Sequence, residues 1–409
     1  MTPALPARQG RERLVVVGAG MAGLKLLEEL AELCPGRYDI TMIGAEPRPA
    51  YNRVLLSSLL AGDAAEADLE LRPRSWYGER RIELVTGIEC TRLLPAERVA
   101  VLSNGTRVAY DRLVLATGSA AARLPIPGSE LRGVVTFRDI SDVNVMCGVE
   151  PGAPAVVIGG GLLGVEAACG LARRGARVTL LHLMPRLMER QLDAHAAGLL
   201  RAAIAQKGIA VVLEAQTVAI GGHGRAEGVV LEDGRCFAAG LVVMATGIRP
   251  RTELAHSGGL ATGRGVRVDD ALRTSAAGIY AIGECAEHRG ACCGLVEPAH
   301  AQAKALARSL AGLPALYQPA APAASLKVSG VPVFSMGDFD GENVETIVLE
   351  DRGAAAYRKL VVRDGRLVGV VLVGDTADAA WYRELITAGA AVAAMRGALA
   401  FGRAYAEAA

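Results

Sequence analysis

The chain has 409 residues, of which 44 are basic and 43 acidic, so its formal net charge is only +1. This balance gives no support to nucleic-acid binding, which needs a basic surface. A hydrophobic content of 51% excludes a disordered chain, and a chain of this length forms two or three domains with room for a large ligand.

The first element is a strand that runs directly into a glycine-rich turn and a helix. In the sequence RLVVVGAGMAG, a β-branched run is followed by Gly18, Gly20 and Gly23. In such turns one glycine permits the tight turn, one lets backbone N–H groups approach a pyrophosphate, and one lets the helix contact the strand. A second strand, Asp39–Gly44, leads to Glu46, which lies 23 residues beyond Gly23 and is a candidate ribose-binding acid.

The same pattern returns 141 residues later in AVVIGGGLLG, which carries Gly159, Gly161 and Gly164 before a helical stretch and a strand at Arg177–His182. A single turn of this kind is weak evidence, because such turns also occur for packing alone. Two copies in the same strand–turn–helix–strand context predict two dinucleotide sites. Two bound dinucleotides indicate electron transfer between them.

Two further apolar strands run into the same tripeptide, Ala-Thr-Gly, which ends at Gly118 and at Gly247. We expect the chain to pass between its domains at these points. A later strand, AGIYAIGEC, reaches Gly283 and Glu284 and precedes a helix predicted over Pro298–Leu310. An acid at such a strand end can accept hydrogen bonds from a polyol or can cap a helix.

The composition changes after these elements. Residues 313–324 (LPALYQPAAPAA) contain three prolines and no charge, as is typical of a linker. Strands at 326–333 and 344–349, with a hairpin turn at the Asp-Gly pair 364–365, predict a small antiparallel sheet. An alanine-rich helix is predicted over 378–399.

This order of elements predicts an α/β chain with two three-layer (ββα-type) Rossmann-like domains and a small α+β C-terminal domain. The predicted parts are the first dinucleotide domain at 11–120 and 247–312, a connecting segment at 121–150, the second dinucleotide domain at 151–246, a linker at 313–324 and the C-terminal domain at 325–409.

The eight cysteines and six histidines show no metal-binding pattern. No CxxC or HExxH spacing occurs, so we predict neither a disulfide framework nor a metal site. The adjacent Cys292 and Cys293 are interpreted as structural, because a reactive thiol needs an exposed, electropositive site.

No apolar run reaches the ~18 residues of a membrane span. The segment Met1–Arg13 lacks the apolar core of a secretory signal. We therefore expect a cytoplasmic protein that binds no membrane.

Together, the two glycine-rich turns, the two Ala-Thr-Gly strand ends and the late GEC resemble the glutathione-reductase-like flavoprotein superfamily, in which a split FAD domain encloses an NAD(P)H domain. Four segments, YNRVLLSSLLAG, LMERQLD, GECAEHRG and LKVSGVPVFSMGD, are similar to the FAD- and NADH-binding module of assimilatory NAD(P)H nitrite reductases and to the electron-transfer subunit of assimilatory nitrate reductases. The resemblance implies FAD and NADH as cofactors.

The resemblance also implies which residues bind FAD. Glu46 would contact the adenosine ribose, Glu284 the ribityl chain, and Arg53 and Ser57 the flavin and its phosphates, although Arg53 alone could equally extend to water. The implied FAD residues are Gly18, Gly20, Met21, Ala22, Gly23, Glu46, Arg53, Ser57, Ala116, Thr117, Gly118, Gly283 and Glu284.

For NAD(P)H, Glu166 would reach the carboxamide or would simply favour the helix dipole. The second nucleotide strand ends at His182 instead of an acid, and Arg186 and Arg190 follow, so these residues leave NADPH open while the resemblance favours NADH. The implied NAD(P)H residues are Gly159, Gly161, Leu162, Leu163, Gly164, Glu166, His182, Arg186 and Gly247.

The chain departs from its resemblance in two respects. Disulfide reductases of the superfamily carry redox-active cysteines near the segment that matches 51–62, but no cysteine lies between Cys34 and Cys90. Nitrite reductases continue into iron-sulfur and sirohaem domains that this sequence lacks. We therefore expect this chain alone to reduce neither disulfides nor nitrite.

The expected reaction is a hydride transfer from nicotinamide to flavin, which needs no catalytic acid or base. Arg53 and Glu166 would only position the cofactors. The resemblance implies an iron-sulfur partner of nitrate or nitrite reductase as electron acceptor.

Two alternatives remain open. One is a rubredoxin or ferredoxin reductase, and the other is a redox-sensing flavoprotein that uses Val331–Leu399 as a binding surface. A homodimer through the C-terminal sheet is compatible with each of these functions.

Overall fold

The computed structural model describes residues 10–319, 323–326, 330–341 and 344–407. Its contacts form two compact units. The first unit contains residues up to 53, 66–120 and 248–319, and the second contains residues 54–65, 121–247 and the described residues from 323 onward. The chain passes between the units at 120–121 and 247–248, close behind the two Ala-Thr-Gly strand ends.

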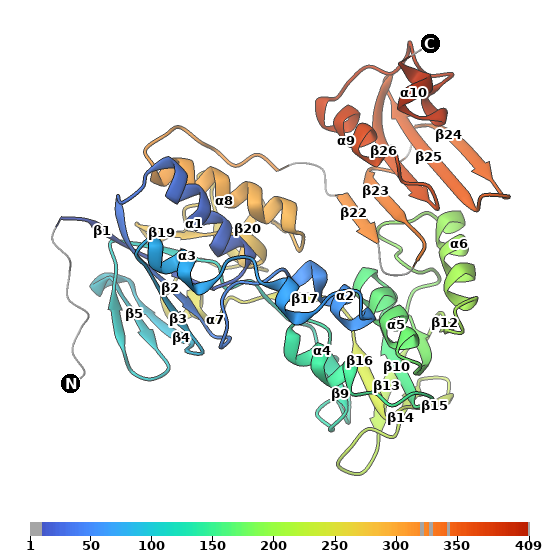
Figure 1. Cartoon of the computed structure of the whole chain (residues 1–409), viewed down its shortest axis with the longest axis horizontal. Coiled ribbons are helices and arrows are strands. Elements are labelled where there is room, and N and C mark those ends of the chain that lie inside the picture. Colours follow the sequence, from blue (N-terminus) through green and yellow to red (C-terminus); the bar gives the residue numbers. More distant parts are fainter. Residues whose placement is uncertain (1–9, 320–322, 327–329, 342–343, 408–409) are drawn as a thin grey trace. The chain divides into compact units, whose positions relative to one another are not determined.

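The first unit is built on a parallel sheet with the strand order β19-β7-β1-β2-β3. Its strands are β1 (Glu12–Val17), β2 (Tyr38–Gly44), β3 (Ile82–Thr86), β7 (Arg112–Leu115) and β19 (Ile279–Ala281). Helices α1 (Met21–Leu33) and α8 (Val296–Leu310) lie side by side over one face (Figure 1). The antiparallel sheet of β4 (Cys90–Leu94), β5 (Val99–Leu102) and β6 (Arg107–Ala109) covers the other face.

Side-chain alternation along β1 creates these three layers. Leu14 and Val16 belong to the core beneath α1 and α8, whereas Val15 and Val17 belong to the core beneath the antiparallel sheet. A strand buried on both faces reads as a continuous apolar run, which is what the sequence shows.

The first unit also contains α3 (Arg74–Glu79), α7 (Glu253–Ser257), β17 (Ile248–Pro250), β18 (Val266–Val268), β20 (Ala286–His288), β21 (Ala291–Cys292) and the 3₁₀ turns Glu66–Leu69, Pro95–Glu97 and Gly283–Cys285.

The second unit repeats the plan with a parallel sheet of order β12-β11-β10-β16-β9. Its strands are β9 (Val134–Thr136), β10 (Pro154–Ile158), β11 (Arg177–Leu181), β12 (Ala210–Val212) and β16 (Leu241–Met244). Its helices are α2 (Leu56–Ala61), α4 (Ile140–Cys147), α5 (Leu162–Arg173) and α6 (Ala194–Ala205). A small antiparallel sheet consists of β13 (Thr217–Gly221), β14 (Gly228–Leu231) and β15 (Cys236–Ala238). Strand β8 (Ser119–Ala121), whose first two residues belong to the first unit, pairs with β17 of that unit.

Helix α2 belongs to the second unit although its sequence lies within the first predicted domain, 11–120. The reason is its contact with α5. A Cβ added at Gly170 would lie 2.7 Å from Leu60, so the absence of a side chain there lets the two helices approach. Arg174 of the turn after α5 also donates to the carbonyl oxygen of Leu59, and Arg173 pairs with Asp63.

The described residues of the C-terminal region form an antiparallel sheet of order β22-β23-β26-β25-β24. The strands are β22 (Ala323–Leu326), β23 (Val333–Gly337), β24 (Glu345–Asp351), β25 (Ala356–Arg363) and β26 (Arg366–Val373). The predicted hairpin at 364–365 is confirmed, since Asp364 (φ 52°) and Gly365 (φ 70°) both adopt the left-handed region that a two-residue turn requires.

Three predictions for this region are wrong. Instead of one strand over 326–333, β22 ends at Leu326 and β23 begins at Val333, and residues 327–329 lie outside the described part. The predicted linker to residue 324 also overlaps β22. Instead of one helix over 378–399, α9 (Ala379–Ala388) stops where Gly389 turns left-handed (φ 57°), and only a 3₁₀ turn (Leu399–Phe401) and α10 (Arg403–Ala406) follow. A glycine cap outweighs the helical preference of the alanines beyond it.

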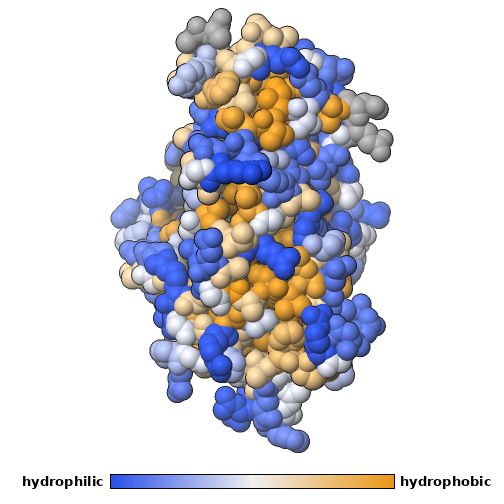
Figure 2. All heavy atoms as spheres, turned by 90° about the vertical axis from the view of Figure 1, so that its right-hand side faces the viewer, coloured by the Kyte–Doolittle hydropathy of each residue, from blue (hydrophilic) through white to orange (hydrophobic). Residues whose placement is uncertain are grey.

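The α/β class with two Rossmann-like domains and a C-terminal domain is confirmed. Hydrophobic residues gather in patches between hydrophilic ones on the face shown in Figure 2. Within the described ranges, however, no helix is long and apolar enough to cross a membrane.

Candidate functional site

The three glycines of the first turn have three different steric environments. At Gly18 (φ +121°), a Cβ would lie closer than 3.0 Å to the carbonyl oxygen of Ala116, and at Gly23 it would collide with the carbonyl oxygen of Gly18. At Gly20 no heavy atom of the described residues lies within 4 Å of an added Cβ. The open space at Gly20 adjoins the first residues of α1, where N–H groups favour an anion, so a pyrophosphate fits there.

The second turn repeats this arrangement. A Cβ at Gly159 (φ +115°) would collide with the carbonyl oxygen of Ala245, and one at Gly164 with that of Gly159. The described residues leave the space at Gly161 open. Both first glycines therefore contact the alanine of an Ala-Thr-Gly strand end, so these tripeptides support the two turns as well as preceding the crossings between units.

Glu46 follows β2 and is held by two neighbours. The hydroxyl of Tyr51 donates to Glu46 Oε2 over 2.9 Å, and the guanidinium of Arg53 forms an ion pair with Glu46 Oε1. The guanidinium also lies 4.9 Å from the centroid of the Tyr51 ring. The structure thus brings the predicted residues Glu46 and Arg53 together at the end of β2.

Glu284 lies beside the first Ala-Thr-Gly turn. Ser119 Oγ lies 2.7 Å from Glu284 Oε2, and a Cβ on Gly118 would lie 3.8 Å from the same oxygen. The backbone N–H of Gly283 donates to Gln302 of α8 over 2.7 Å. The predicted residues Gly118, Gly283 and Glu284 are therefore neighbours, whereas sequence reasoning missed Ser119 and Gln302, which carry no motif.

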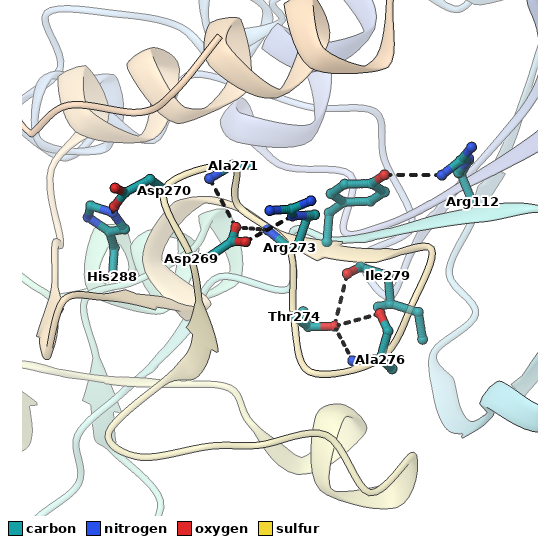
Figure 3. Close-up of polar contacts among 10 residues, drawn as sticks. Arg112, Asp269, Asp270, Ala271, Arg273, Thr274, Ala276, Ile279 and His288 are labelled. Atoms are coloured by element: carbon teal, nitrogen blue, oxygen red, sulfur yellow. Dashed lines mark hydrogen bonds and ion pairs between the residues drawn. The ribbon is translucent and has the colours of Figure 1, made fainter. Parts of the chain in front are cut away.

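A polar network fixes the loop that leads into β19 and hence to Glu284 (Figure 3). Asp269 accepts from the backbone N–H groups of Ala271 and Arg273, each over 2.9 Å, and Thr274 donates to the carbonyl oxygen of Ile279. The neighbouring Asp270 pairs with Arg289 and His288, which lower the pKa of its carboxyl group to about 2. These bonds fix the approach of β19.

The remaining predicted FAD residues occupy separate places. Met21 and Ala22 begin α1, and Ala116 and Thr117 precede Gly118, with Thr117 Oγ1 donating to the carbonyl oxygen of Arg251. Ser57 is buried in α2 and donates to the carbonyl oxygen of Val54, so it belongs to the second unit, unlike the other residues predicted for FAD.

Among the predicted NAD(P)H residues, Leu162 and Leu163 begin α5, and Glu166 is 8% exposed within the same helix. Gly247 adopts a left-handed φ of +107° where the chain leaves the unit.

His182, directly after β11, is buried against the second glycine turn. Its Nδ1 accepts from the backbone N–H of Gly160 over 2.9 Å, and its Nε2 lies 3.0 Å from Glu189 Oε2. A Cβ on Gly160 would lie 2.6 Å from the His182 ring, so only glycine fits there. Arg186 forms an ion pair with Asp340 over 3.2 Å.

Sequence reasoning missed Gly160 and Glu189. The available signal for Gly160 was the run of three consecutive glycines in the second turn, where the first turn has Ala19 in the middle. In the first copy the glycine lies instead at the strand end, at Gly44, where an added Cβ would lie 2.6 Å from the Cβ of Ala19.

All eight cysteines are free thiols. Burial raises the pKa of Cys90 and of Cys169 to about 11, and burial also raises the pKa of Cys292 and Cys293. A raised pKa reduces the thiolate fraction at neutral pH, and the thiolate is the reactive form. The described ranges contain no group of three or more His, Cys, Asp or Glu side chains able to hold a metal ion.

We therefore expect the variants Cys292→Ser and Cys293→Ser to reduce an artificial electron acceptor with NADH at rates within about twofold of the unchanged protein. In an alkylation time course at neutral pH followed by mass spectrometry, the exposed Cys236 should react before Cys292 and Cys293. Loss of most of the activity in either variant would contradict the structural interpretation of these two cysteines.

The family model for pyridine nucleotide-disulphide oxidoreductases matches residues 12–306, and that for the C-terminal domain of rubredoxin NAD+ reductases matches residues 322–390. The chain is 45% identical to NAD(P)H nitrite reductase and 41% identical to the assimilatory nitrate reductase electron transfer subunit, both from Bacillus subtilis, over 90% of its length. It spans about half of these two curated relatives, 46% and 48% respectively.

The fold is similar to that of a ferredoxin reductase from Rhodopseudomonas palustris, with a TM-score of 0.86 and 27% identity over 93% of this chain and 96% of the other. The resemblance that the sequence motifs indicated is thus confirmed. The chain belongs to the pyridine nucleotide-disulphide oxidoreductase family and is a flavin-dependent NAD(P)H oxidoreductase with FAD and NAD(P)H as its cofactors.

Proposed function

We propose that this chain takes electrons from NADH and passes them through FAD to an iron-sulfur centre of a nitrate- or nitrite-reducing partner. Bound FAD supplies a flavin N5 that accepts hydride from C4 of the nicotinamide. The acceptor is proposed from the relatives that share most of this chain, a nitrite reductase and a nitrate reductase electron transfer subunit.

The observation that carries the proposal is the pair of glycine turns, each with open space at its middle glycine, Gly20 and Gly161. If such a turn served only for packing, its middle position could carry a small side chain, because the described residues leave room for a Cβ there. A glycine at this position is instead required where a ligand approaches the backbone closely. Two such turns on two parallel sheets suit one dinucleotide each.

In this proposal the residues of the chain bind and orient the cofactors and transfer no proton. Gly18, Gly20, Met21, Ala22 and Gly23 would hold the FAD pyrophosphate at the start of α1. Glu46, held by Tyr51 and Arg53, would accept hydrogen bonds from the adenosine ribose. The remaining FAD contacts would come from Ser57, Ala116, Thr117, Gly118, Gly283 and Glu284.

The second turn would hold the nicotinamide dinucleotide in the same way. Gly159, Gly161, Leu162, Leu163 and Gly164 would bind its pyrophosphate at the start of α5. Glu166 would orient the carboxamide, and His182, Arg186 and Gly247 would lie around the coenzyme.

The test is anaerobic mixing of the purified, FAD-loaded protein with NADH in a stopped-flow spectrometer. We expect the yellow colour of bound FAD to bleach within seconds, because hydride transfer between two bound cofactors would need no further activation. Flavin that stays oxidised for minutes would overturn the reductase function.

A ferredoxin or rubredoxin reductase is the second candidate, favoured by the C-terminal match at 322–390 and by the structural likeness over nearly the whole chain. Steady-state rates with a ferredoxin, a rubredoxin and an iron-sulfur nitrite or nitrate reductase component separate the two. Slow turnover with all three would favour the redox-sensing alternative instead.

We also propose a cytoplasmic location and a homodimer through the C-terminal sheet. The sheet exposes β22 and β24 as its edges, and an edge strand is a pairing site for another chain. Analytical ultracentrifugation of the FAD-loaded protein tests the dimer: a single species at the monomer mass would exclude it.

A further inference from the structure

The two dinucleotide copies differ at the end of their second strand. In the strand registers, Val17 pairs with Ile43 in the first copy, and Ile158 pairs with Leu181 in the second. Glu46 lies three residues beyond Ile43, so its counterpart in the second copy, three residues beyond Leu181, is Met184. Met184 is 42% exposed, and its thioether sulfur is only a weak acceptor and carries no charge that could repel a phosphate.

His182 does not take the role of an acid equivalent to Glu46, but its ring contacts a different acid, Glu189. Because the N–H of Gly160 donates to Nδ1 of His182, that nitrogen is an acceptor and the ring proton lies on Nε2. Nε2 then donates to Oε2 of Glu189 over 3.0 Å. The His182 side chain is 8% exposed, whereas that of Glu189 is 26% exposed, so the carboxylate retains a surface for a ligand.

The backbone attaches Glu189 to the glycine turn a second time. The N–H of Met188 donates to the carbonyl oxygen of Gly160 over 2.9 Å, and Met188 adopts a left-handed φ of 49°. A non-glycine residue in this region requires support from its surroundings. The left-handed backbone at Met188 therefore brings the chain back to the glycine-rich turn at Gly160, and Glu189 lies beside that turn.

Two arginines lie near Glu189 in the chain: Arg186 is already paired, and Arg190, the next residue after Glu189, is exposed. The guanidinium of Arg186 donates to the carbonyl oxygen of Glu189 over 3.4 Å and to Asp340 over 3.2 Å. Asp340 also lies 3.5 Å from Nζ of Lys359. A 2′-phosphate would have to compete with Asp340 for Arg186 while facing the negative charge of Glu189.

We propose that Glu189, positioned by His182, is the acid that accepts a hydrogen bond from the adenosine-ribose 2′-hydroxyl of NADH and repels the 2′-phosphate of NADPH. The inference rests on the proposed function, because it presumes that the second turn holds the coenzyme. It assigns the choice of coenzyme to a residue outside the usual strand-end position.

The test measures dissociation constants of NAD+ and NADP+ for the FAD-loaded, oxidised protein by titration calorimetry, so that binding is observed without turnover. We expect the unchanged protein to bind NAD+ more tightly, and the ratio of the two constants to shift toward NADP+ by about tenfold in Glu189→Gln. The control is Glu150→Gln, since Glu150 is an exposed acid in the turn before β10, at the opposite end of the strand.

A second variant tests the cation separately. In Asp340→Asn, Arg186 loses its carboxylate partner, so NADP+ should bind at least about threefold more tightly while NAD+ binding stays unchanged. Thermal unfolding of each variant checks that the fold is retained.

The outcomes are distinct. If neither coenzyme binds the unchanged protein, the proposed function and this inference both fall. If NAD+ binds but Glu189→Gln leaves the ratio unchanged, the role of Glu189 falls and the proposed function stands. If the unchanged protein prefers NADP+, the role of Glu189 falls together with the choice of NADH, while electron transfer from NAD(P)H through FAD stands.

Discussion

The variant Gly18→Ala should purify without FAD. Its Cβ would lie closer than 3.0 Å to the carbonyl oxygen of Ala116, and a φ of +121° is strained for any residue with a side chain. Relief requires the turn or the β7 strand end to move, and overpacking of this kind costs about 1–3 kcal/mol. We expect the affinity for FAD to fall about 100-fold, which corresponds to about 2.7 kcal/mol.

The measurement is the flavin-to-protein ratio after gel filtration, followed by titration of the apoprotein with FAD. The control is Gly105→Ala in the turn between β5 and β6, which has a similarly positive φ of +84° but no described heavy atom within 4 Å of the added Cβ. If both variants lose FAD equally, general destabilisation explains the loss, and the specific role of Gly18 is wrong.

The variant Gly159→Ala should remain yellow but resist reduction by NADH. Its Cβ would collide with the carbonyl oxygen of Ala245, and its φ is +115°, so the second turn suffers the same distortion as the first does in Gly18→Ala. The first turn, which would hold FAD, is untouched. We expect the concentration of NADH that gives half-maximal reduction to rise about 100-fold.

Stopped-flow reduction at increasing NADH concentration measures this effect, with dithionite as a reductant that bypasses the coenzyme site. Gly152→Ala, in the turn before β10, is the matched control: its φ is +79° and the described residues leave the space around the added Cβ open. Loss of FAD from Gly159→Ala would contradict the assignment of the two turns to two different dinucleotides.

The two turns were predictable because their chemistry is local. Strand, turn and helix are consecutive in the chain, and glycine is the residue that tolerates the backbone at Gly18 and Gly159. The contacts of these glycines with Ala116 and Ala245 were not predictable as such, because they join strands far apart in the sequence. The repeated Ala-Thr-Gly was visible, but its supporting role was not.

The hydrogen-bond partners of Glu46 and Glu189 were the least predictable feature of the candidate site. Glu46 has a characteristic spacing from Gly23, but its bonds to Tyr51 and Arg53 depend on how the chain turns after β2. Glu189 has no spacing that distinguishes it from other acids, and only the hydrogen bond with His182 reveals it. In the C-terminal region, Gly389 could have been read as a helix stop within the alanine-rich segment.

The close contact between turn and strand end is solved in opposite ways in the two halves. In the first half Ala19 of the turn faces Gly44, so the residue without a side chain is at the strand end. In the second half Gly160 faces His182, so the residue without a side chain is in the turn. A graft of GAG into the second half would drive a methyl group into the imidazole. A chimaera that exchanges segments between the two dinucleotide halves must therefore transfer the turn residue and its strand-end partner together.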